Sequence, residues 1–381
     1  MTAASLSRTP DLERPAGGSV GAVRVLRAVL SPSDPRLKLA LRIARYLIGL
    51  GLAGLAVVVL LGRKGELSGS AASFRHLRLW WLAPSLLVEA ISMVCFARTL
   101  GRLLTEGRHR LRPGPVLAIT LASNAIANSL PAGPAFGAAY AYRRMRDLGV
   151  PEIVAGWAML ASGVLAAAAL ALMASVGVAV ALDQSTDLNL VSVTAGTVAV
   201  SVVLLGLLRR PGLLAGPVVL AARASRRLFG IPRSGPGPLA EMVRSRLAVV
   251  TPSWPGLSAA FGWAFGNWTF DLSCLIFAFL AVDSAVPWRG ILLAYGAAQL
   301  ASNLPITPGG LGVVEGSLTI GLVAYGGAEA STVAAVLVYR VLSFWLPLLI
   351  GWAVAGVLAL KARRAVVREA GPDVRVMEVS G

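Results

Sequence analysis

The chain has 381 residues, of which 56% are hydrophobic and 14% are charged, and its formal net charge is +17. Soluble domains carry about 25% charged residues, so the composition excludes an ordinary soluble enzyme and indicates an integral membrane protein. The basic residues lie beside apolar segments and no nucleic-acid-binding module accompanies them, so the charge indicates membrane orientation and anionic headgroups instead of nucleic acid.

Apolar segments follow one another after a polar N-terminal stretch. Residues 1–41 are expected to form a flexible cytoplasmic tail, because they carry Pro and Arg and lack an apolar core before Leu37. Apolar spans are expected at 42–62, 80–97, 114–131, 153–182, 190–208, 257–282, 289–304, 311–326 and 331–360. The predicted organisation is all-α and polytopic, with a first membrane half (42–208), a basic cytoplasmic connection (209–256), a second membrane half (257–360) and a cytoplasmic tail (361–381).

Two of these segments are broken by Pro and Gly. The first reads SNAIANSLPAGPAFG (123–137) and the second ASNLPITPGGLG (301–312), and each has an Asn before Leu-Pro. Proline removes a backbone donor, and lipid cannot satisfy the freed backbone groups, so they must face protein or a watery cavity. A related pair of broken segments in two halves is typical of a transporter site built from repeats. The candidate site residues in the breaks are Asn124, Asn128, Pro131, Asn303, Pro308, Gly309, Gly310 and Gly312.

The distribution of Lys and Arg predicts the topology. Most of them fall in the tail up to and including Arg45, in 98–112, in 143–146, in 209–256 and after Leu360, which places both termini in the cytoplasm. The first outer loop, with Arg63 and Lys64, violates this rule. The assignment requires 114–147 to enter from the cytoplasm and return there, and 289–326 to do the same from outside. The expectation is an inverted repeat with about six full crossings and two re-entrant helical hairpins. The alternative is that the two breaks share only the Pro and Gly common in membrane helices.

The motifs PITPGGLGVVEGSL (305–318) and VLVYRVLSFWLPLLIGW (336–352) resemble the lysylphosphatidylglycerol synthase transmembrane-region family, and the resemblance covers about 40–360. Its most specific marks are Pro308, Gly309, Gly310, Gly312 and Glu315, followed by Arg340. The resemblance implies a membrane protein that translocates or handles lipid. Bifunctional members of that family carry an acyltransferase-like domain after the membrane region. Only about 21 residues follow Leu360, so aminoacyl transfer is not expected of this chain.

The ionisable residues deepest in apolar spans are Glu89, Asp271, Glu315 and Arg340. Each would cost roughly 2.5–3.5 kcal/mol if it faced lipid, so they are expected to pair or to line a cavity. Glu315 and Arg340 complement each other in charge and predict a bidentate ion pair. The ion pair has two interpretations. It either fixes the second hairpin to the last helix, or it opens so that Arg340 can bind a lipid phosphate.

The other two acids and the asparagines have two interpretations each. Glu89 either takes up a proton in a coupling cycle or bonds to backbone amides freed at the first break. Asp271 is expected to find local partners in Asn267, Trp268 and Thr269. The asparagines of the breaks are expected to donate to carbonyls exposed by the prolines, with direct contact to a ligand as the alternative.

Arg143, Arg144 and Arg146 close the predicted cytoplasmic hairpin. They could gather anionic headgroups at the inner leaflet, or they could act only as topology determinants. Cys95 and Cys274 lie within apolar spans, and their spacing predicts packing instead of a disulfide or a metal site.

The sequence therefore predicts a flippase or transporter that moves an anionic or modified phospholipid, or a lipid-linked precursor, between leaflets by alternating access. Two alternatives remain open. One is a membrane enzyme that uses Glu89 and Asp271 on a lipid-linked substrate, and the other is a scaffold for a lipid-synthase partner. No cofactor, metal or nucleic acid is expected. The expected partners are membrane lipids, the expected location is the cell membrane, and a homo-oligomer is compatible with the sequence.

Overall fold

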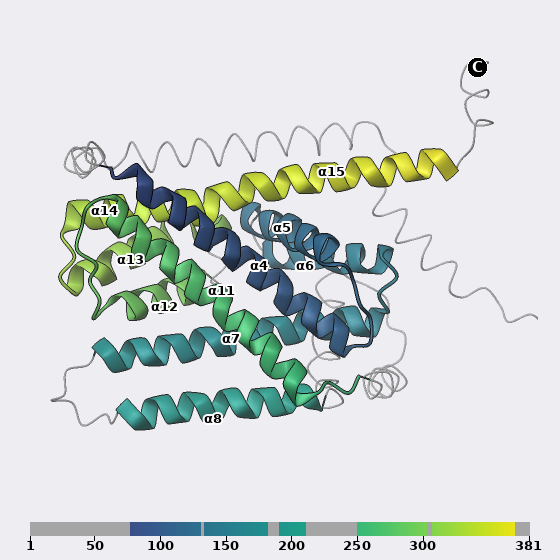
Figure 1. The fold of residues 1–381 in the computed structure, drawn as a ribbon, viewed down its shortest axis with the longest axis horizontal. Helices are drawn as coiled ribbons and strands as arrows, with labels where there is room; N and C mark the ends of the chain where they lie inside the picture. The colour runs from purple at the N-terminus through teal and green to yellow at the C-terminus, as the bar shows by residue number, and fades with distance from the viewer. Residues whose placement is uncertain (1–76, 131–132, 182–189, 211–249, 303–306, 370–381) are drawn as a thin grey trace, which may run out of the picture. The chain divides into compact units, whose positions relative to one another are not determined.

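The structure is a computed structural model that describes residues 77–130, 133–181, 190–210, 250–302 and 307–369. Within these ranges the ordered elements are helices and no strand occurs, which confirms the predicted all-α class (Figure 1). Internal packing divides the chain into residues 1–62 and 63–381, and every described residue belongs to the second unit. The predicted span 42–62 and most of the predicted connection, 211–249, lie outside the described residues.

The helices follow the predicted apolar spans closely. Their bounds are α4 (Leu82–Glu106), α5 (Pro113–Ser129), α6 (Gly133–Asp147), α7 (Glu152–Ala181), α8 (Leu190–Arg209), α11 (Trp254–Ala281), α12 (Ile291–Ser302), α13 (Val313–Ala324), α14 (Glu329–Arg340) and α15 (Leu346–Glu369). Four helical segments in the described part of the chain are long and apolar enough to cross a membrane: Leu79–Glu106, Glu152–Ala181, Trp254–Ala281 and Glu329–Ala362.

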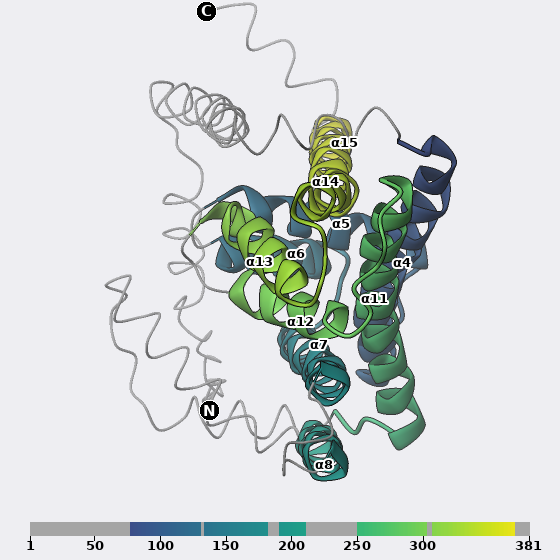
Figure 2. The ribbon, with the colours of Figure 1, turned by 90° about the vertical axis from the view of Figure 1, so that its left-hand side faces the viewer.

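Helices α4 and α11 form an antiparallel pair, and both views show them side by side (Figures 1 and 2). At one end Trp81, in the turn before α4, stacks on Phe277 with ring centroids 5.7 Å apart. At the other end the Glu106 carboxylate accepts a hydrogen bond of 2.8 Å from the Ser253 backbone N–H. Because both ends are fixed, the register of the pair determines which polar side chains meet near its middle.

Basic residues gather at the end of this pair that contains Glu106 and Ser253, which we call the 106/253 end. Arg146 pairs with Glu152 at the start of α7, with 3.5 Å between Nη2 and Oε1. The Arg209 guanidinium lies 5.1 Å from the centre of the Trp254 ring. At the opposite end, which we call the 78/283 end, Arg78 and Asp283 form an exposed ion pair of 2.9 Å.

The first helical hairpin consists of α5 and α6, which pack closely through small residues. A Cβ atom placed on Gly137 would lie 2.5 Å from the Ser123 carbonyl oxygen and 2.9 Å from the Ala127 Cβ atom. The hairpin starts just after α4 ends and returns to Arg146, so both of its ends lie at the 106/253 end.

The second helical hairpin consists of α12 and α13. A Cβ atom placed on Gly321 would lie 2.8 Å from the Ala294 Cβ atom, so the two helices touch along their apolar faces. The Tyr325 ring at the end of α13 covers Gly290, just before α12. Both ends of this hairpin therefore lie at the 78/283 end, opposite to the ends of the first hairpin.

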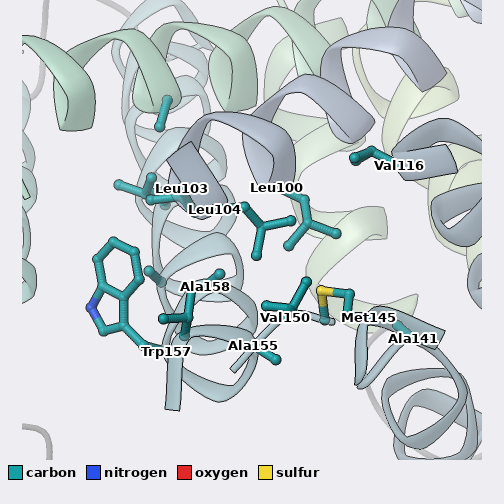
Figure 3. Packing of buried hydrophobic residues seen from close by; sticks show 14 of the residues in the cluster. Leu100, Leu103, Leu104, Val116, Ala141, Met145, Val150, Ala155, Trp157 and Ala158 are labelled. Carbon is teal, nitrogen blue, oxygen red and sulfur yellow. The ribbon is translucent and has the colours of Figure 1, made fainter. Parts of the chain in front are cut away.

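Buried hydrophobic residues form two clusters. The first lies near the 106/253 end, where Leu100, Leu103 and Leu104 of α4 meet Ala158 of α7 and Met145 of α6 (Figure 3). The second joins α11, α12, α13 and α14, and Tyr295 and Tyr339 are among its fully buried residues. Apolar side chains are also exposed along α8 and α15, as on surfaces that face lipid; they include Val200, Val202, Val203, Leu349 and Ile350.

The last helical segment contains a π-helical stretch, Val341–Trp345, between α14 and α15. Pro347 follows it and has no N–H to donate to the Ser343 carbonyl, so a regular α-helical bond is absent at this point. Such π-helical turns inside α-helices are frequent at functional sites. Here the wide turn comes directly after Arg340.

Alanine in place of Gly351 is expected to destabilise the protein by about 1–3 kcal/mol. An added Cβ atom would overlap the Leu121 carbonyl oxygen and lie 2.6 Å from the Ala125 Cβ atom, where α15 crosses α5. Gly356→Ala on the same helix is the control, because no atom lies within 4 Å of its added Cβ atom. Thermal unfolding in detergent measures both, and equal midpoints for the two variants would contradict the close crossing.

Candidate functional site

The first helix break lies where the sequence predicts it. Helix α5 ends at Ser129, and Leu130 adopts an extended conformation with φ −124° and ψ 146°. A residue before proline is biased toward this region of backbone conformation, as expected here before Pro131. Residues 131–132 lie outside the described residues, and α6 begins at Gly133.

The second break is built from glycines with positive φ. Gly309, Gly310 and Gly312 have φ values of 59°, 67° and 81°, a region that side chains with a Cβ atom rarely adopt. Pro308 opens the short 3-10 turn that ends at Gly310. The helix is therefore interrupted here, as predicted, and residues 303–306, including Asn303, lie outside the described residues.

The two breaks contact each other. A Cβ atom placed on Gly309 would lie 3.0 Å from the backbone oxygen of Asn128, so the second break approaches the end of α5 closely. The Asn128 side chain donates to the Asn124 side-chain oxygen at 3.2 Å. The expectation that Asn128 also donates to a carbonyl freed by proline stays a prediction, because the amide has a second N–H and 131–132 and 303–306 lie outside the described residues.

Arg340 holds the second break in place. Its Nε donates to Glu315 Oε1 at 2.6 Å, and its Nη2 donates to the Gly309 carbonyl at 3.2 Å. The other Glu315 oxygen accepts from the Gly312 N–H at 2.7 Å and so caps α13. The predicted ion pair forms, but it is not bidentate, because the carboxylate divides its oxygens between Arg340 and the helix cap. The guanidinium also lies 4.2 Å from the centre of the Phe344 ring.

A second polar cluster surrounds Asp271 on α11. Its Oδ2 accepts from the hydroxyl of Tyr295, from the hydroxyl of Tyr339 at 2.9 Å and from the Gln299 amide at 3.2 Å. These donors come from α12 and α14, so the cluster joins α11 to the second hairpin and to α14, all within the second membrane half. The sequence reasoning missed all three donors, although Tyr295 and Gln299 lie one helical turn apart in an otherwise apolar helix.

The predicted local partners of Asp271 bond elsewhere. Trp268 donates its ring N–H to the Ala166 carbonyl at 2.8 Å, and Thr269 donates to the carbonyl one turn earlier in α11. Asn267 accepts from the Ser92 hydroxyl. That prediction is wrong because each of these side chains bonds to another group, while Tyr295, Gln299 and Tyr339 of α12 and α14 reach the Asp271 carboxylate.

Glu89 lies in α4, directly across from α11. It is 2% exposed, and apart from the facing Asp271 carboxyl its two carboxyl oxygens have no hydrogen-bond partner among the described residues. The expectation that Glu89 bonds to amides of the first break is wrong, because the register of α4 turns Glu89 toward Asp271. The carboxyl groups of Glu89 and Asp271 interact electrostatically.

Asparagine in place of Asp271 is expected to cost about 1–3 kcal/mol of stability, because three donors converge on one carboxylate oxygen. Asp283→Asn is the matched control, since its ion pair with Arg78 is half exposed and such pairs contribute about 0–1 kcal/mol. Thermal unfolding of the two variants gives the comparison. A larger loss for Asp283→Asn would show that the buried cluster contributes little.

The arginines at the end of α6 differ in their contacts. Arg144 pairs with Asp147 at 3.2 Å, and Arg146 donates to the Val150 carbonyl at 2.6 Å. Arg143 is exposed. Arg144 and Arg146 thus help to fix the end of the first hairpin.

Apolar helices of membrane-crossing length, two interrupted hairpins that meet, and ionisable groups buried between helices together define a multi-pass α-helical membrane protein. The chain belongs to the lysylphosphatidylglycerol synthase TM region family, whose family model matches residues 45–351. The resemblance predicted from the two motifs is thereby confirmed.

Two curated relatives are also similar to the chain. A UPF0104 membrane protein of Pyrococcus horikoshii is 30% identical over 111 residues, which cover 29% of this chain and 32% of the relative. A UPF0104 membrane protein of Methanothermobacter thermautotrophicus is 42% identical over 87 residues, which cover 23% and 24%. The similar region thus spans a third or less of each relative. It supports the assignment as a membrane protein and does not indicate a substrate.

Proposed function

We propose that this protein moves a phospholipid with an anionic or modified headgroup, or a lipid-linked precursor, between the leaflets of the cell membrane. The observation that carries the proposal is the position of Arg340, whose guanidinium lies where the second break meets the first. A cation inside apolar helices is costly, and such residues usually mark a substrate pathway.

The guanidinium of Arg340 has five N–H donors, and its contacts with described residues engage Nε and Nη2. Nη1 is then available to a phosphate oxygen. A phosphate can also compete with Glu315 for Nε, because the N–H groups of a guanidinium bind the oxygens of carboxylates and of phosphates with the same forked geometry. Glu315 would keep its bond to the Gly312 N–H when Arg340 turns toward the headgroup.

The hairpins supply the proposed path. In this proposal α5–α6 re-enters the membrane from the cytoplasm and α12–α13 re-enters from outside, as an inverted repeat with both termini in the cytoplasm. The support is that the two hairpins have their ends at opposite ends of the α4–α11 pair, while their breaks touch. Basic residues at the 106/253 end favour the cytoplasm on that side, where Arg143 can gather anionic headgroups.

Reconstitution into vesicles tests the proposal. The full chain is placed in vesicles with a trace of fluorescent phosphatidylglycerol, and a membrane-impermeant quencher reports the fraction in the outer leaflet. Wild-type protein is expected to make the inner-leaflet probe accessible, whereas Arg340→Gln is expected to slow this by at least about tenfold, as for the loss of one charge-assisted bond. Asp283→Asn serves as the control, since its exposed ion pair lies at the 78/283 end.

The enzyme alternative is favoured by one observation, the adjacent carboxyl groups of Glu89 and Asp271. An enzyme that uses this pair would convert its lipid substrate in detergent, where no leaflets exist. Chemical change of a lipid in detergent, with no redistribution in vesicles, would therefore replace the transport proposal.

A further inference from the structure

The carboxyl groups of Glu89 on α4 and Asp271 on α11 meet near the middle of these two helices, and the proposed lipid path does not involve them. Ser92 of α4 donates to the Asn267 carbonyl of α11 at 3.0 Å. One turn earlier in α4 and one turn later in α11, this antiparallel register brings Glu89 level with Asp271. The two side chains come from different helices and are both buried.

The two carboxyl groups have opposite hydrogen-bond environments. Asp271 accepts from Tyr295, Tyr339 and Gln299, all on its Oδ2 atom. Glu89 faces the Asp271 carboxyl and finds no donor for either oxygen among the described residues, so its oxygens are the ones in the pair that are free to carry a proton. Two adjacent buried carboxyl groups also resist a shared double negative charge, so they titrate as a unit.

We propose that Glu89 and Asp271 form a binding site for one exchangeable proton, carried by Glu89 and donated toward Asp271. No bond other than O–H forms or breaks: the proton enters from water on one side, resides on the Glu89 carboxyl and leaves to water on the other side. The further statement that this proton drives lipid movement rests on the proposed function.

The groups around the pair give a route for coupling. Among the described residues, the titratable and charged groups that interact with it are Cys274 on α11, Tyr295 on α12, and Tyr339 and Arg340 on α14. Arg340 is the cation among them, and it is also the residue proposed to bind the lipid phosphate. An anionic headgroup on Arg340 would neutralise its field at Asp271 and so favour proton uptake by the pair.

Infrared spectroscopy tests the proton site without any transport. The full chain in vesicles of phosphatidylglycerol and phosphatidylcholine is titrated with pH while the carbonyl stretch of protonated carboxylic acids is recorded. Wild type is expected to show a band that Glu89→Gln removes. Glu106→Gln, on the same helix, is the matched control and should keep the band, because Glu106 contacts Ser253 at the 106/253 end and lies away from the Glu89–Asp271 pair. No such band in wild type, or a band that survives Glu89→Gln, would overturn the proposal.

Leaflet redistribution tests the coupling. A transmembrane difference of one pH unit is expected to shift the leaflet ratio of fluorescent phosphatidylglycerol by up to about tenfold for one proton per lipid. Glu89→Gln should remove this shift, and Glu89→Asp should restore part of it. A shift driven by a sodium gradient and not by pH would overturn the proposal in favour of a sodium site.

The two proposals fail separately. If wild type redistributes no lipid but shows a band that depends on Glu89, the transport function and the coupling are rejected and the proton site is supported. If lipid moves without a Glu89 band and without a response to pH, the transport function is supported and the proton site is rejected.

Discussion

Replacing Arg340 with Gln is expected to lower the stability of the protein by about 3 kcal/mol, at the lower end of the range for breaking a buried ion pair. The lower end applies because 18% of the Glu315 side chain is exposed. The loss arises because Glu315 keeps a buried charge without its cation, and the Gly309 carbonyl loses a donor. Thermal unfolding in detergent measures the change.

A double-mutant cycle then separates a structural role of this pair from a substrate-binding role. Glu315→Gln combined with Arg340→Gln removes both charges, so its stability is expected to recover much of the loss seen in the single Arg340 variant. If Arg340 binds the headgroup, the double variant regains stability but still redistributes lipid at least about tenfold more slowly than wild type. Full recovery of redistribution together with stability would show that the pair only fixes the second hairpin to α14.

Replacing Gly309 with Ala is expected to cost about 2–5 kcal/mol, the sum of two effects. A side chain at φ 59° costs about 1–2 kcal/mol, and overpacking adds about 1–3 kcal/mol because the new Cβ atom would overlap the Phe344 ring. Two control glycines lie nearby. Gly312→Ala should show only the backbone cost, since no atom lies within 4 Å of its added Cβ atom.

Gly316→Ala, inside α13, should be neutral or stabilising by up to about 1 kcal/mol, because alanine favours a helix. The expected order of unfolding midpoints is thus Gly316→Ala highest, then Gly312→Ala, then Gly309→Ala. Equal losses for Gly309→Ala and Gly312→Ala would mean that the Phe344 contact is absent in the membrane.

The helices and their breaks were predictable because apolar length and Pro-Gly chemistry are local properties of the sequence. The predicted spans 153–182 and 257–282 correspond to Glu152–Ala181 and Trp254–Ala281. The helix predicted at 80–97 extends to Glu106. Its last turns carry Arg98, Arg102 and Glu106 and are too polar for a hydropathy criterion, so the prediction ended the helix too early.

The partners of the buried acids were not predictable, because they depend on which helices pack together. Asp271 bonds to Tyr295 and Tyr339, which lie 24 and 68 residues further along the chain. The ion pair of Glu315 with Arg340 was predictable, since these are opposite charges in neighbouring apolar helices. What the sequence did not indicate is that the same carboxylate also caps α13.

The measurement that tests the central claim most directly is to map where the headgroup passes. A phosphatidylglycerol with a photoreactive headgroup is incorporated into vesicles with the full chain, and the labelled peptides are identified by mass spectrometry. Labels are expected on 123–130, on 307–315 and around Arg340, and Arg340→Gln should remove them. Labels confined to lipid-facing residues such as Val200 and Val203 of α8, unchanged by Arg340→Gln, would contradict a headgroup path between the two breaks.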